Sequence, residues 1–446
     1  MSKKINTQNL KGVNDFASSE QLLRNNIMKI FRETFERYGY EPLDTAILCT
    51  YDLLAYKYDN NAEILHEIYK LTDQGERSLG LRYDLTIPFC KVIANNKNLS
   101  LPYRRYEMGH VFRNGPVKLG RSREFYQCDV DVVGIDGRYI EIEQLCLVTD
   151  VFNKIGIDVT IKWNNRKIMT GLLMESGIPE NQITNAIGII DKKEKISPSE
   201  LLNEFSKIGL TENQYHLIIA NFSQTLDDFC CRTDFHNDTL LEGIQEAKNT
   251  QALISQIEML NNKTLFSPSL ARGLGIYTGI VFEFYDRDCR LTCSLGGGGR
   301  YNKIITDFMD DGNEYPALGL SFGLEPIYTI LKDNTVKDNL VNVYIIPMST
   351  EIECLKLATT LRTEGLNVVI EMNKKKIKKC FEYADKQKIR YVIVVGENEI
   401  AKGLFTVKDM EKREQVELTA VDLVRYVKEG GNDTNVDSNV ITNQYY

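Results

Sequence analysis

The chain has 446 residues, of which 43% are hydrophobic and 26% are charged. This composition is typical of a soluble globular protein, and the length predicts two or three domains. The formal net charge of −8 excludes indiscriminate binding to nucleic acid, although a local basic patch remains compatible with it. The first residues lack the apolar run of a signal peptide, and no later segment has the length and apolarity of a membrane span. We therefore expect a cytoplasmic protein that does not bind membranes.

Cysteine and histidine usage gives little support for a metal centre. The ten cysteines are scattered without CxxC pairs, and the chain has only four histidines. A zinc site would have few ligands to draw on, and reduced cysteines fit a cytoplasmic protein. We predict no metal site made by protein ligands.

The N-terminal third predicts a helix, a strand-rich region and a second helix. Apolar residues recur at helical spacing over residues 20–39, and this pattern ends at Gly39. Strand signals are densest between residues 79 and 134. A helical pattern returns over residues 140–156.

Two strands joined by a basic loop are predicted within residues 103–134. The second strand alternates from Arg123 to Val132. One face carries Arg123, Phe125, Gln127, Asp129 and Asp131, and the other carries Glu124, Tyr126, Cys128, Val130 and Val132. The apolar set can pack against a core, which leaves Gln127, Asp129 and Asp131 facing something polar.

The loop of this hairpin, NGPVKLGRS, concentrates positive charge. Its two glycines and its proline mark it as a loop, which would hold Arg113, Lys118, Arg121 and Arg123 close together. An anion would relieve their mutual repulsion, and the planar fork of arginine suits phosphate. An exposed basic hairpin with scattered surface ion pairs is the alternative, and this stretch alone leaves both interpretations open.

The middle of the chain predicts a helical insertion in a strand-rich domain. Residues from about 165 to 262 are nearly all helix-patterned and charged. Strand patterns resume at RGLGIYTGIVFEFYD and continue to SLGGGGRYNKIITDF. The glycine run indicates only that the backbone passes close to another group.

A second domain is predicted beyond the composition break near residue 333. Short apolar strands alternate there with amphipathic helices in a βαβαβ pattern, which implies a largely parallel sheet. A lysine run, Lys374, Lys375, Lys376, Lys378 and Lys379, is expected to begin the second helix and to form a solvated face. Residues 431–446 are polar and unpatterned, and we expect a disordered tail.

Four motifs in order carry a family resemblance: LRYDLTIPF, FRNGPVKLGRSREFYQCDVDVVG, LARGLGIYTG and GGGGRYNKII. With them the chain resembles class II aminoacyl-tRNA synthetases, and more closely the histidyl-tRNA synthetase family, over nearly all of residues 8–430. The resemblance implies an α+β class II catalytic domain over residues 1–330, with a mostly antiparallel sheet and the helical insertion. It also implies an anticodon-binding α/β domain with a mostly parallel sheet over residues 338–430.

The same resemblance implies an activity and its partners. Members of the family activate histidine with ATP to histidyl-adenylate and transfer the histidyl group to the 3′ end of tRNA(His), with Mg²⁺ bridging the outer phosphates of ATP. They are homodimers that associate through motif 1, here GYEPLDTAILCTYDLL. In this family the lysine-rich segment becomes a plausible RNA contact, so that both interpretations of it stay open.

The resemblance also implies roles for individual residues. Arg113 would hold the α-phosphate of ATP, with Arg121 and Arg123 directed towards the outer phosphates. Arg272 would reach the α-phosphate and the substrate carboxylate, so that Arg113 and Arg272 are the expected catalytic residues. The expected histidine-binding residues are Asp84, Thr86, Gln127, Asp131, Arg272, Tyr277 and Tyr301.

The chain departs from the family pattern at four motifs. Ala46 stands where motif 1 normally has proline, and Gly115 where motif 2 usually has an acidic residue. In RGLGIYTG, Gly275 and Ile276 replace an acid and a tyrosine. Pro326 stands where motif 3 normally has the arginine that grips the outer phosphates of ATP.

Two other functions remain as alternatives. One is a synthetase paralogue that binds histidine or tRNA without efficient catalysis, which Pro326 would favour. The other is a regulatory subunit of ATP phosphoribosyltransferase in histidine biosynthesis, which resembles the catalytic domain. That subunit normally lacks the C-terminal domain and the RGL–YTG stretch, and both are present here.

Overall fold

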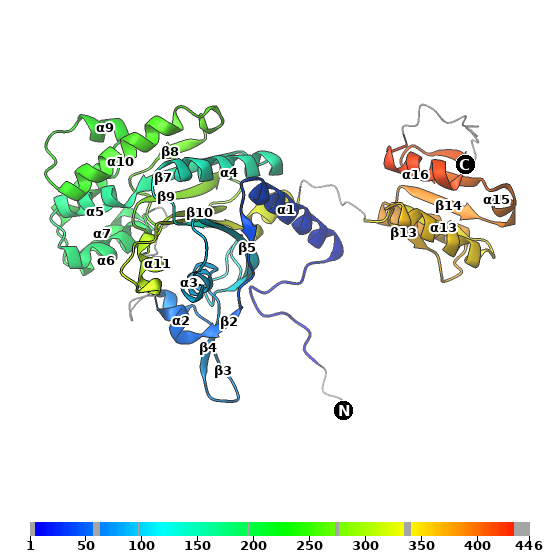
Figure 1. Ribbon diagram of the computed structural model, residues 1–446, viewed down its shortest axis with the longest axis horizontal. Helices are drawn as coiled ribbons and strands as arrows, with labels where there is room; N and C mark the ends of the chain where they lie inside the picture. The colour runs from blue at the N-terminus through cyan, green and yellow to red at the C-terminus, as the bar shows by residue number, and fades with distance from the viewer. Residues whose placement is uncertain are drawn as a thin grey trace. The chain divides into compact units, whose positions relative to one another are not determined.

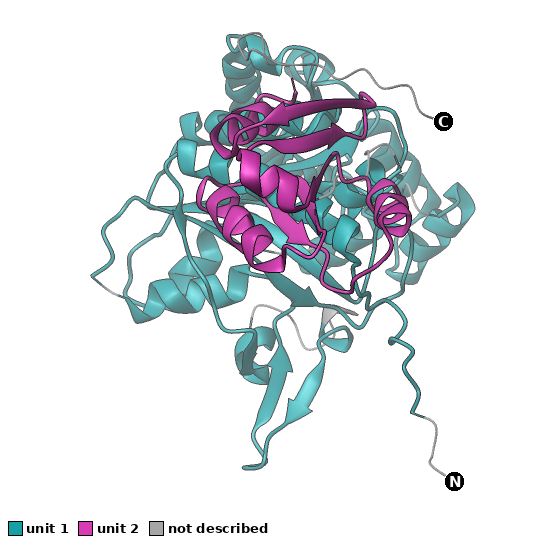
Figure 2. Ribbon diagram, turned by 90° about the vertical axis from the view of Figure 1, so that its right-hand side faces the viewer, with its two compact units in different colours: residues 1–334 teal, residues 335–446 magenta. Residues whose placement is uncertain are grey.

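The computed structural model of the chain describes residues 5–56, 63–96, 98–193, 196–272, 276–333 and 340–431 (Figure 1). The chain forms two compact units, residues 1–334 and 335–446, and each is described by itself (Figure 2). The tail that we expect to be disordered lies outside the described residues beyond residue 431. Among the described helices, none combines the length and apolarity that crossing a bilayer requires.

An eight-stranded sheet is the frame of the first unit. Its strands, in spatial order, are β1 (Glu41–Pro42), β5 (Tyr103–Phe112), β6 (Glu124–Val133), β11 (Ala317–Gly323), β10 (Gly296–Arg300), β9 (Ile280–Asp286), β7 (Val159–Asn165) and β8 (Thr264–Phe266). The β1–β5 and β7–β8 pairs are parallel, and the other five pairs are antiparallel. The expected mostly antiparallel catalytic sheet is confirmed.

Helices bury the apolar face of this sheet. The long helices α1 (Ser18–Arg37) and α4 (Tyr139–Ile155) correspond to the two helices predicted over residues 20–39 and 140–156. Phe31 and Phe35 of α1 pack against Phe322 of β11, with ring centroids 5.1 and 5.7 Å apart. A shorter helix, α12 (Leu324–Leu331), follows β11 directly and also packs on α1. This core leaves the opposite face of the central strands for polar side chains.

Smaller elements flank the sheet. Strands β2 (Leu48–Thr50), β4 (Ser78–Leu81) and β3 (Lys70–Thr72) form an antiparallel three-stranded sheet in that order. The remaining elements are α2 (Tyr51–Ala55), η1 (Glu63–His66), α3 (Thr86–Asn95) and α11 (Asn302–Met309).

A helical insertion separates β7 from β8, as expected. It comprises α5 (Arg166–Glu175), α6 (Glu180–Ile190), α7 (Pro198–Lys207), α8 (Glu212–Asn221), α9 (Leu226–Cys231), α10 (Asp238–Ile254) and η2 (Glu258–Leu260). Helices α5 and α10 cross closely because Gly171 and Gly243 lack side chains. A Cβ on Gly171 would lie 2.4 Å from the Leu240 Cβ, and one on Gly243 would lie 2.7 Å from the Ile168 nitrogen.

The second unit has a five-stranded sheet with the βαβαβ pattern at its core. In spatial order its strands are β13 (Val368–Ile370), β12 (Val343–Pro347), β14 (Tyr391–Val395), β15 (Phe405–Asp409) and β16 (Glu414–Leu418). The three strands of the βαβαβ pattern are parallel, and β15 and β16 add an antiparallel hairpin. Its helices are α13 (Glu351–Thr363), α14 (Ile377–Gln387), α15 (Glu397–Lys402) and α16 (Ala420–Lys428).

The lysine run does not begin helix α14 as predicted. The helix starts at Ile377, so that Lys374, Lys375 and Lys376 precede it. Lys374 has φ of +50°, which is incompatible with an α-helix. The positive end of the helix dipole also disfavours additional cations at a helix N-terminus.

Candidate active site

The polar face of the central sheet is fixed by strand register. The alternation predicted for β6 is confirmed, because Cys128, Val130 and Val132 are buried in the apolar core. On the other face, the residues of β5, β6 and β11 form three cross-strand rows: Arg105–Asp131–Gly319, Glu107–Asp129–Ser321 and Gly109–Gln127–Gly323. Cross-strand partners project to the same side of a sheet, so these residues share one surface.

Glycines on this surface make room for charged side chains. A Cβ on Gly297 of β10 would lie 1.9 Å from Nη1 of Arg272. A Cβ on Gly319 of β11 would lie 2.0 Å from Oδ1 of Asp131. Real Cβ atoms do not approach other atoms so closely, so a side chain at either position would displace a charged group. The group predicted next to the glycine run is therefore a charged side chain of the same chain, Arg272.

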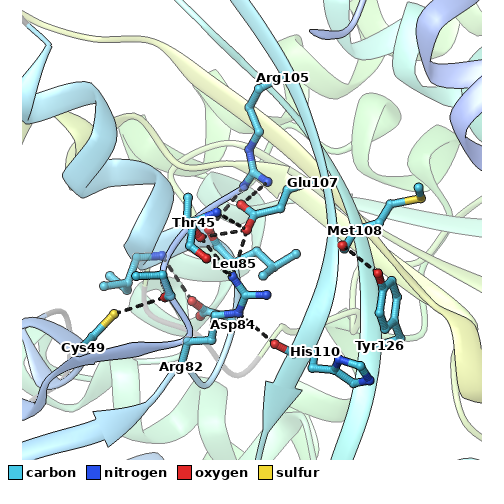
Figure 3. A network of polar contacts seen from close by, with 12 residues as sticks. Thr45, Cys49, Arg82, Asp84, Leu85, Arg105, Glu107, Met108, His110 and Tyr126 are labelled. Carbon is cyan, nitrogen blue, oxygen red and sulfur yellow. Dashed lines mark hydrogen bonds and ion pairs between the residues drawn. The ribbon is translucent and has the colours of Figure 1, made fainter. Parts of the chain in front are cut away.

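A buried ionic network beneath the hairpin is centred on Glu107 (Figure 3). Its Oε1 accepts hydrogen bonds from the Thr45 backbone nitrogen at 2.9 Å and from Nη1 of Arg82 at 2.9 Å. Its Oε2 lies 3.3 Å from Nη1 of Arg105. Arg82 also donates to the Thr45 carbonyl at 2.7 Å and to the His110 carbonyl at 2.8 Å. The network joins the segment before β2, the segment after β4 and strand β5.

Asp131 and Tyr301, both predicted to bind histidine, contact each other. The Tyr301 hydroxyl donates a hydrogen bond to Oδ1 of Asp131. Oδ2 of Asp131 lies 2.7 Å from Nη2 of Arg105. Asp131 and Tyr301 are both buried. We call the surface formed by the three cross-strand rows the floor of the site. Asp131 and Tyr301 support this floor, and neither lines the cavity above it.

A cavity of about 290 Å³ lies over this floor and brings together four of the predicted site residues. It is lined by Arg113, Arg121, Gln127 and Arg272, and also by Pro326. Two guanidinium groups from the β5–β6 loop and a third from Arg272 thus surround one space, an arrangement that suits a polyanion. Within the described parts of the chain, no three His, Cys, Asp or Glu side chains gather as metal ligands.

The cavity-lining arginines are held by aromatic and backbone groups. The Arg113 guanidinium lies 4.2 Å from the centre of the Tyr83 ring and 4.9 Å from that of Phe125. Its Nε donates to the Tyr83 carbonyl at 3.3 Å. These contacts fix the plane of the guanidinium while leaving its terminal nitrogens available on the cavity side. Arg121, by contrast, is exposed at the tip of the loop.

Arg272 sits in a niche of the sheet rather than in a free loop. Its Nη1 donates to the Phe282 carbonyl at 3.3 Å and lies 4.0 Å from Oε1 of Glu283. Its guanidinium is 5.6 Å from the centre of the Tyr277 ring. Of the two departures next to it, Gly275 lies outside the described residues, and Ile276 is buried in an apolar cluster.

The four remaining predicted residues do not line the cavity. Oδ1 of Asp84 accepts a hydrogen bond from the Ile87 nitrogen at 3.1 Å, and Thr86 is the first residue of α3. The Arg123 Nε donates to the Gly115 carbonyl at 3.4 Å, so this side chain braces the loop. None of Asp84, Thr86, Arg123 and Tyr277 lines the 290 Å³ cavity.

The sequence did not indicate two positions that contact the cavity or the basic loop, Glu67 and Gly12. Glu67 lines the cavity, accepts a hydrogen bond from the Tyr83 hydroxyl at 3.1 Å, and has Oε1 only 2.7 Å from the place of a Cβ on Gly115. A carboxylate therefore occupies the region where the motif 2 acid is missing. The Gly12 carbonyl accepts from the Arg123 nitrogen at 2.7 Å and anchors the loop to the N-terminal segment. The gap at Gly115 was the available signal for Glu67, whereas Gly12 gave none.

Pro326 is accommodated in the first turn of helix α12. It is the third residue of the helix, where a missing backbone N–H costs no intrahelical hydrogen bond. The preceding Glu325 is buried and binds Arg24 of α1 at 2.9 Å and the Tyr126 nitrogen at 2.8 Å. The turn is thus held in place, and its third residue presents an apolar ring to the cavity.

Gln127 at the cavity wall and Asp129 on the same strand each have a buried polar atom without a partner among the described residues. The Gln127 Nε2 donates to the Ser321 hydroxyl at 2.6 Å, while Oε1 of Gln127 and Oδ1 of Asp129 are buried and bond no described residue. Burial raises the pKa of the Asp129 carboxyl to about 8; Arg105 acts against this shift and Asp131 adds to it. These two buried acceptor atoms therefore lack a hydrogen-bond donor among the described residues.

Two family models match the chain. The histidyl-tRNA synthetase model matches residues 12–327, and an anticodon binding domain model matches residues 342–430. The first match covers the eight-stranded sheet and the helical insertion, and the second covers the five-stranded sheet.

Individual relatives match over nearly the whole chain. A protein named histidine–tRNA ligase 1 from Bacillus cereus is 41% identical over 425 residues, which is 94% of this chain and 99% of the relative. Histidine–tRNA ligase 2 from Shouchella clausii is 40% identical over 92% of this chain and 97% of its own length.

Solved structures give the same picture of the fold. The crystal structure of histidyl-tRNA synthetase from Nostoc sp. PCC 7120 matches with a TM-score of 0.82 at 30% identity, covering 96% of this chain and all of that one. A structure from Bacillus halodurans, described as an ATP phosphoribosyltransferase regulatory subunit/histidyl-tRNA synthetase, has a TM-score of 0.73 at 20% identity over 88% of this chain and 99% of that one. At that identity the second likeness concerns the fold alone.

Proposed function

This chain belongs to the histidyl-tRNA synthetase family, and from that premise we propose that it activates histidine with ATP and transfers the histidyl group to the 3′ end of tRNA(His). The observation that carries the proposal is the convergence of Arg113, Arg121 and Arg272 on one cavity, beside the polar wall at Gln127. Three fixed cations suit a triphosphate, and an acceptor wall suits an amino acid.

ATP would lie along the basic loop of the β5–β6 hairpin. Arg113 holds the α-phosphate, because its guanidinium is fixed between Tyr83 and Phe125 at the cavity wall. Arg121 reaches the outer phosphates from the exposed tip of the loop. Arg123 supports the same phosphate contacts by holding the loop in place through the Gly115 carbonyl. Pro326 supplies no charge. Arg121 would therefore make the contact to the outer phosphates that the arginine of motif 3 normally makes.

Histidine would lie over the three cross-strand rows of the floor. Gln127 contacts it directly from the cavity wall, and Arg272 receives its carboxylate. Asp131 and Tyr301 form the floor, Asp84 and Thr86 flank it at the start of α3, and Tyr277 closes on the imidazole.

The first chemical step is attack of the histidine carboxylate on the α-phosphorus of ATP, which releases pyrophosphate. Arg113 and Arg272 stabilise the negative charge that develops on the α-phosphate and orient the two reactants. In the second step the terminal ribose hydroxyl of the tRNA attacks the carbonyl carbon, and AMP leaves. Neither step requires a side-chain nucleophile.

Mg²⁺ is the implied cofactor, and the cavity fits an ion that is held chiefly by phosphate oxygens. Glu67 is the single carboxylate among the cavity-lining residues, and one carboxylate is a common protein contribution to such an ion. The ion would supply neutralisation of charge on the outer phosphates.

Residues 338–430 are proposed to bind the anticodon, and residues 1–330 to carry the chemistry, with the helical insertion at about 165–262. The exposed lysines around the start of α14 would contact the RNA backbone. A homodimer through residues 39–54 is proposed on the same family basis. Ile47 and Leu48 in that segment are 42% and 50% exposed, which fits an interface. We place the protein in the cytoplasm.

A catalytically inefficient paralogue is the second candidate, and Pro326 is the observation that favours it. The regulatory-subunit alternative is weaker, because the anticodon binding domain is present and close relatives are named histidine–tRNA ligases.

Histidine-dependent ATP–pyrophosphate exchange tests the proposal, with each other amino acid as a control. Exchange with histidine alone is the expected result. Tight binding of histidine or tRNA without exchange would instead identify the paralogue.

A further inference from the structure

The floor of the site carries one more carboxylate than its cations balance. Glu107 is paired with Arg82 and Arg105, and Asp131 is paired with Arg105. Asp129 lies opposite Glu107 on the neighbouring strand and two residues before Asp131 on its own strand. It forms no ion pair with any residue that the structure describes. Two guanidinium groups thus face three carboxylates.

This third carboxylate is deeply buried. Asp129 is 4% exposed, and its Oδ1 is buried without a hydrogen bond from the described residues. A carboxylate in such a place is unfavourable without a cation, so the neutral acid is the stable form of the empty site at neutral pH. The raised pKa of Asp129, about 8, agrees with this charge state.

A short polar path joins Asp129 to the cavity. The Ser321 hydroxyl is hydrogen-bonded to the Asp129 carboxyl and also accepts from Nε2 of Gln127 at 2.6 Å. Ser321 and Gln127 both line the cavity, and Oε1 of Gln127 is buried without a donor from the described residues. A buried acceptor at the wall with an acid behind it is suited to a ligand group that is both a hydrogen-bond donor and a cation.

We propose that Asp129 is the counter-charge for the α-ammonium group of the amino acid, and that it loses its proton to solvent when this group binds beside Gln127 and Ser321. The inference rests on the proposed function, since it assigns a role within the same amino-acid site. The O–H bond of the Asp129 carboxyl breaks, the ammonium keeps its three protons, and the ion pair that results is neutral. Asp129 acts here as a residue of substrate binding, not of the chemical step.

The groups that face Asp129 come from every neighbouring element. They are Arg105 and Glu107 on β5, Asp131 on β6, Ser321 on β11 and Asp84 ahead of α3. Glu107 and Asp131 are already held by guanidinium groups, and Asp84 accepts a hydrogen bond from the Ile87 nitrogen at 3.1 Å. Asp129 is therefore the carboxyl whose charge depends on the substrate.

Calorimetric titration with histidine at pH 7, in buffers with different ionisation enthalpies, measures the protons released on binding. Wild-type protein is expected to release about one proton, and Asp129→Asn none. At pH 8.5, above the pKa of Asp129, the Asn variant should bind histidine at least roughly tenfold more weakly. Asp227→Asn, an exposed change on α9, keeps the wild-type release and controls for net charge.

Two ligand fragments identify the group that is sensed. Histamine keeps the ammonium and imidazolepropionate lacks it, so release with histamine alone supports the assignment. Release with imidazolepropionate, or equal release from wild type and Asp129→Asn, would overturn it.

If the variant does not fold, infrared titration of the empty wild-type protein decides, because absence of a protonated buried carboxyl at pH 7 refutes the inference. Failure of wild type to bind histidine contradicts the proposed function; binding without proton release contradicts this inference alone.

Discussion

The Arg272 guanidinium lies directly over Gly297, at a distance that no other residue type at position 297 would permit. A Cβ there would be 1.9 Å from Nη1 of Arg272 and 2.4 Å from the Phe282 carbonyl oxygen. The glycine run of β10 is thus part of the site because it leaves space for a cation. The position of this cation depends on the strand beneath it.

Gly297→Ala is expected to displace Arg272 and to reduce pyrophosphate exchange roughly 100-fold or more, because one of the fixed cations leaves the cavity. The same change should destabilise the catalytic unit by about 1–3 kcal/mol through overpacking. Exchange rates and urea unfolding measure the two effects. Gly188→Ala on α6, where a Cβ meets nothing within 4 Å, is the matched control. An active Gly297→Ala enzyme would remove Arg272 from the mechanism.

Arg113→Ala should abolish histidine-dependent exchange without unfolding the protein. The lost guanidinium would leave the α-phosphate without its stacked partner between Tyr83 and Phe125. Exchange kinetics and circular dichroism give the two readouts, and Arg37→Ala on the exposed side of α1 is the control. Wild-type rates in Arg113→Ala would refute the proposed phosphate contact.

Arg24→Ala should destabilise the catalytic unit by about 3–5 kcal/mol, since it leaves Glu325 buried without its cation. Glu325 would keep only its bond from the Tyr126 nitrogen. Urea unfolding monitored in the first unit measures the loss. Arg24→Ala combined with Glu325→Gln should recover part of it, and a double variant as unstable as the sum of the single ones would argue against direct coupling.

Asp129→Asn should make the empty protein more stable than wild type at alkaline pH. Since the pKa of Asp129 is raised in the folded state to about 8, the folded protein binds more protons than the unfolded chain between about pH 4 and 8. The stability contribution of Asp129 is therefore fully present below about pH 4 and is lost as the pH rises from about 4 to 8, by at most about 1.4 kcal/mol per pH unit. Between pH 5 and 8.5, the unfolding temperature of the variant should rise relative to that of the wild type. If the two unfolding temperatures change in parallel with pH, the raised pKa of Asp129 is contradicted.

Changing Lys374, Lys376 and Lys378 together to Gln should raise the KM for tRNA and leave pyrophosphate exchange unchanged. Each lysine–phosphate ion pair that the change removes should lower the salt dependence of tRNA binding by about 0.7–0.9 in the log–log slope. Lys402→Gln, exposed on α15 of the same unit, is the control. An unchanged KM and an unchanged salt slope would show that these lysines form a solvated face without contact to the RNA.

The sequence predicted what repeats along the chain and missed what depends on contacts across it. The alternation of β6 correctly separated Cys128 and Val130 from Gln127 and Asp129, because period-two patterning reports which face is buried. The contact between Asp131 and Tyr301 joins residues 170 positions apart, and no local pattern reports such a pairing.

The same limit explains the other differences. The Glu67 carbonyl accepts a hydrogen bond from the Asn114 nitrogen of the loop, and its carboxylate accepts one from the Tyr83 hydroxyl; only the folded chain creates these contacts. Charge counts place the start of α14 too early because they say nothing about backbone dihedrals such as that of Lys374. The family resemblance supplied the roles of the site residues, and the fold shows which of them line one cavity.

The pairing of β6 with β11 has a consequence for biosynthesis. Gln127 and Ser321, which meet at the cavity wall, are 194 residues apart, with the helical insertion between them. At about 5–20 residues per second, a ribosome needs roughly 10–40 s to supply the second strand after the first. During that time the edge of β6 has no β11 partner, while the insertion is already synthesised. The proposed amino-acid site is therefore completed late in translation, and until then β6 is exposed to mispairing.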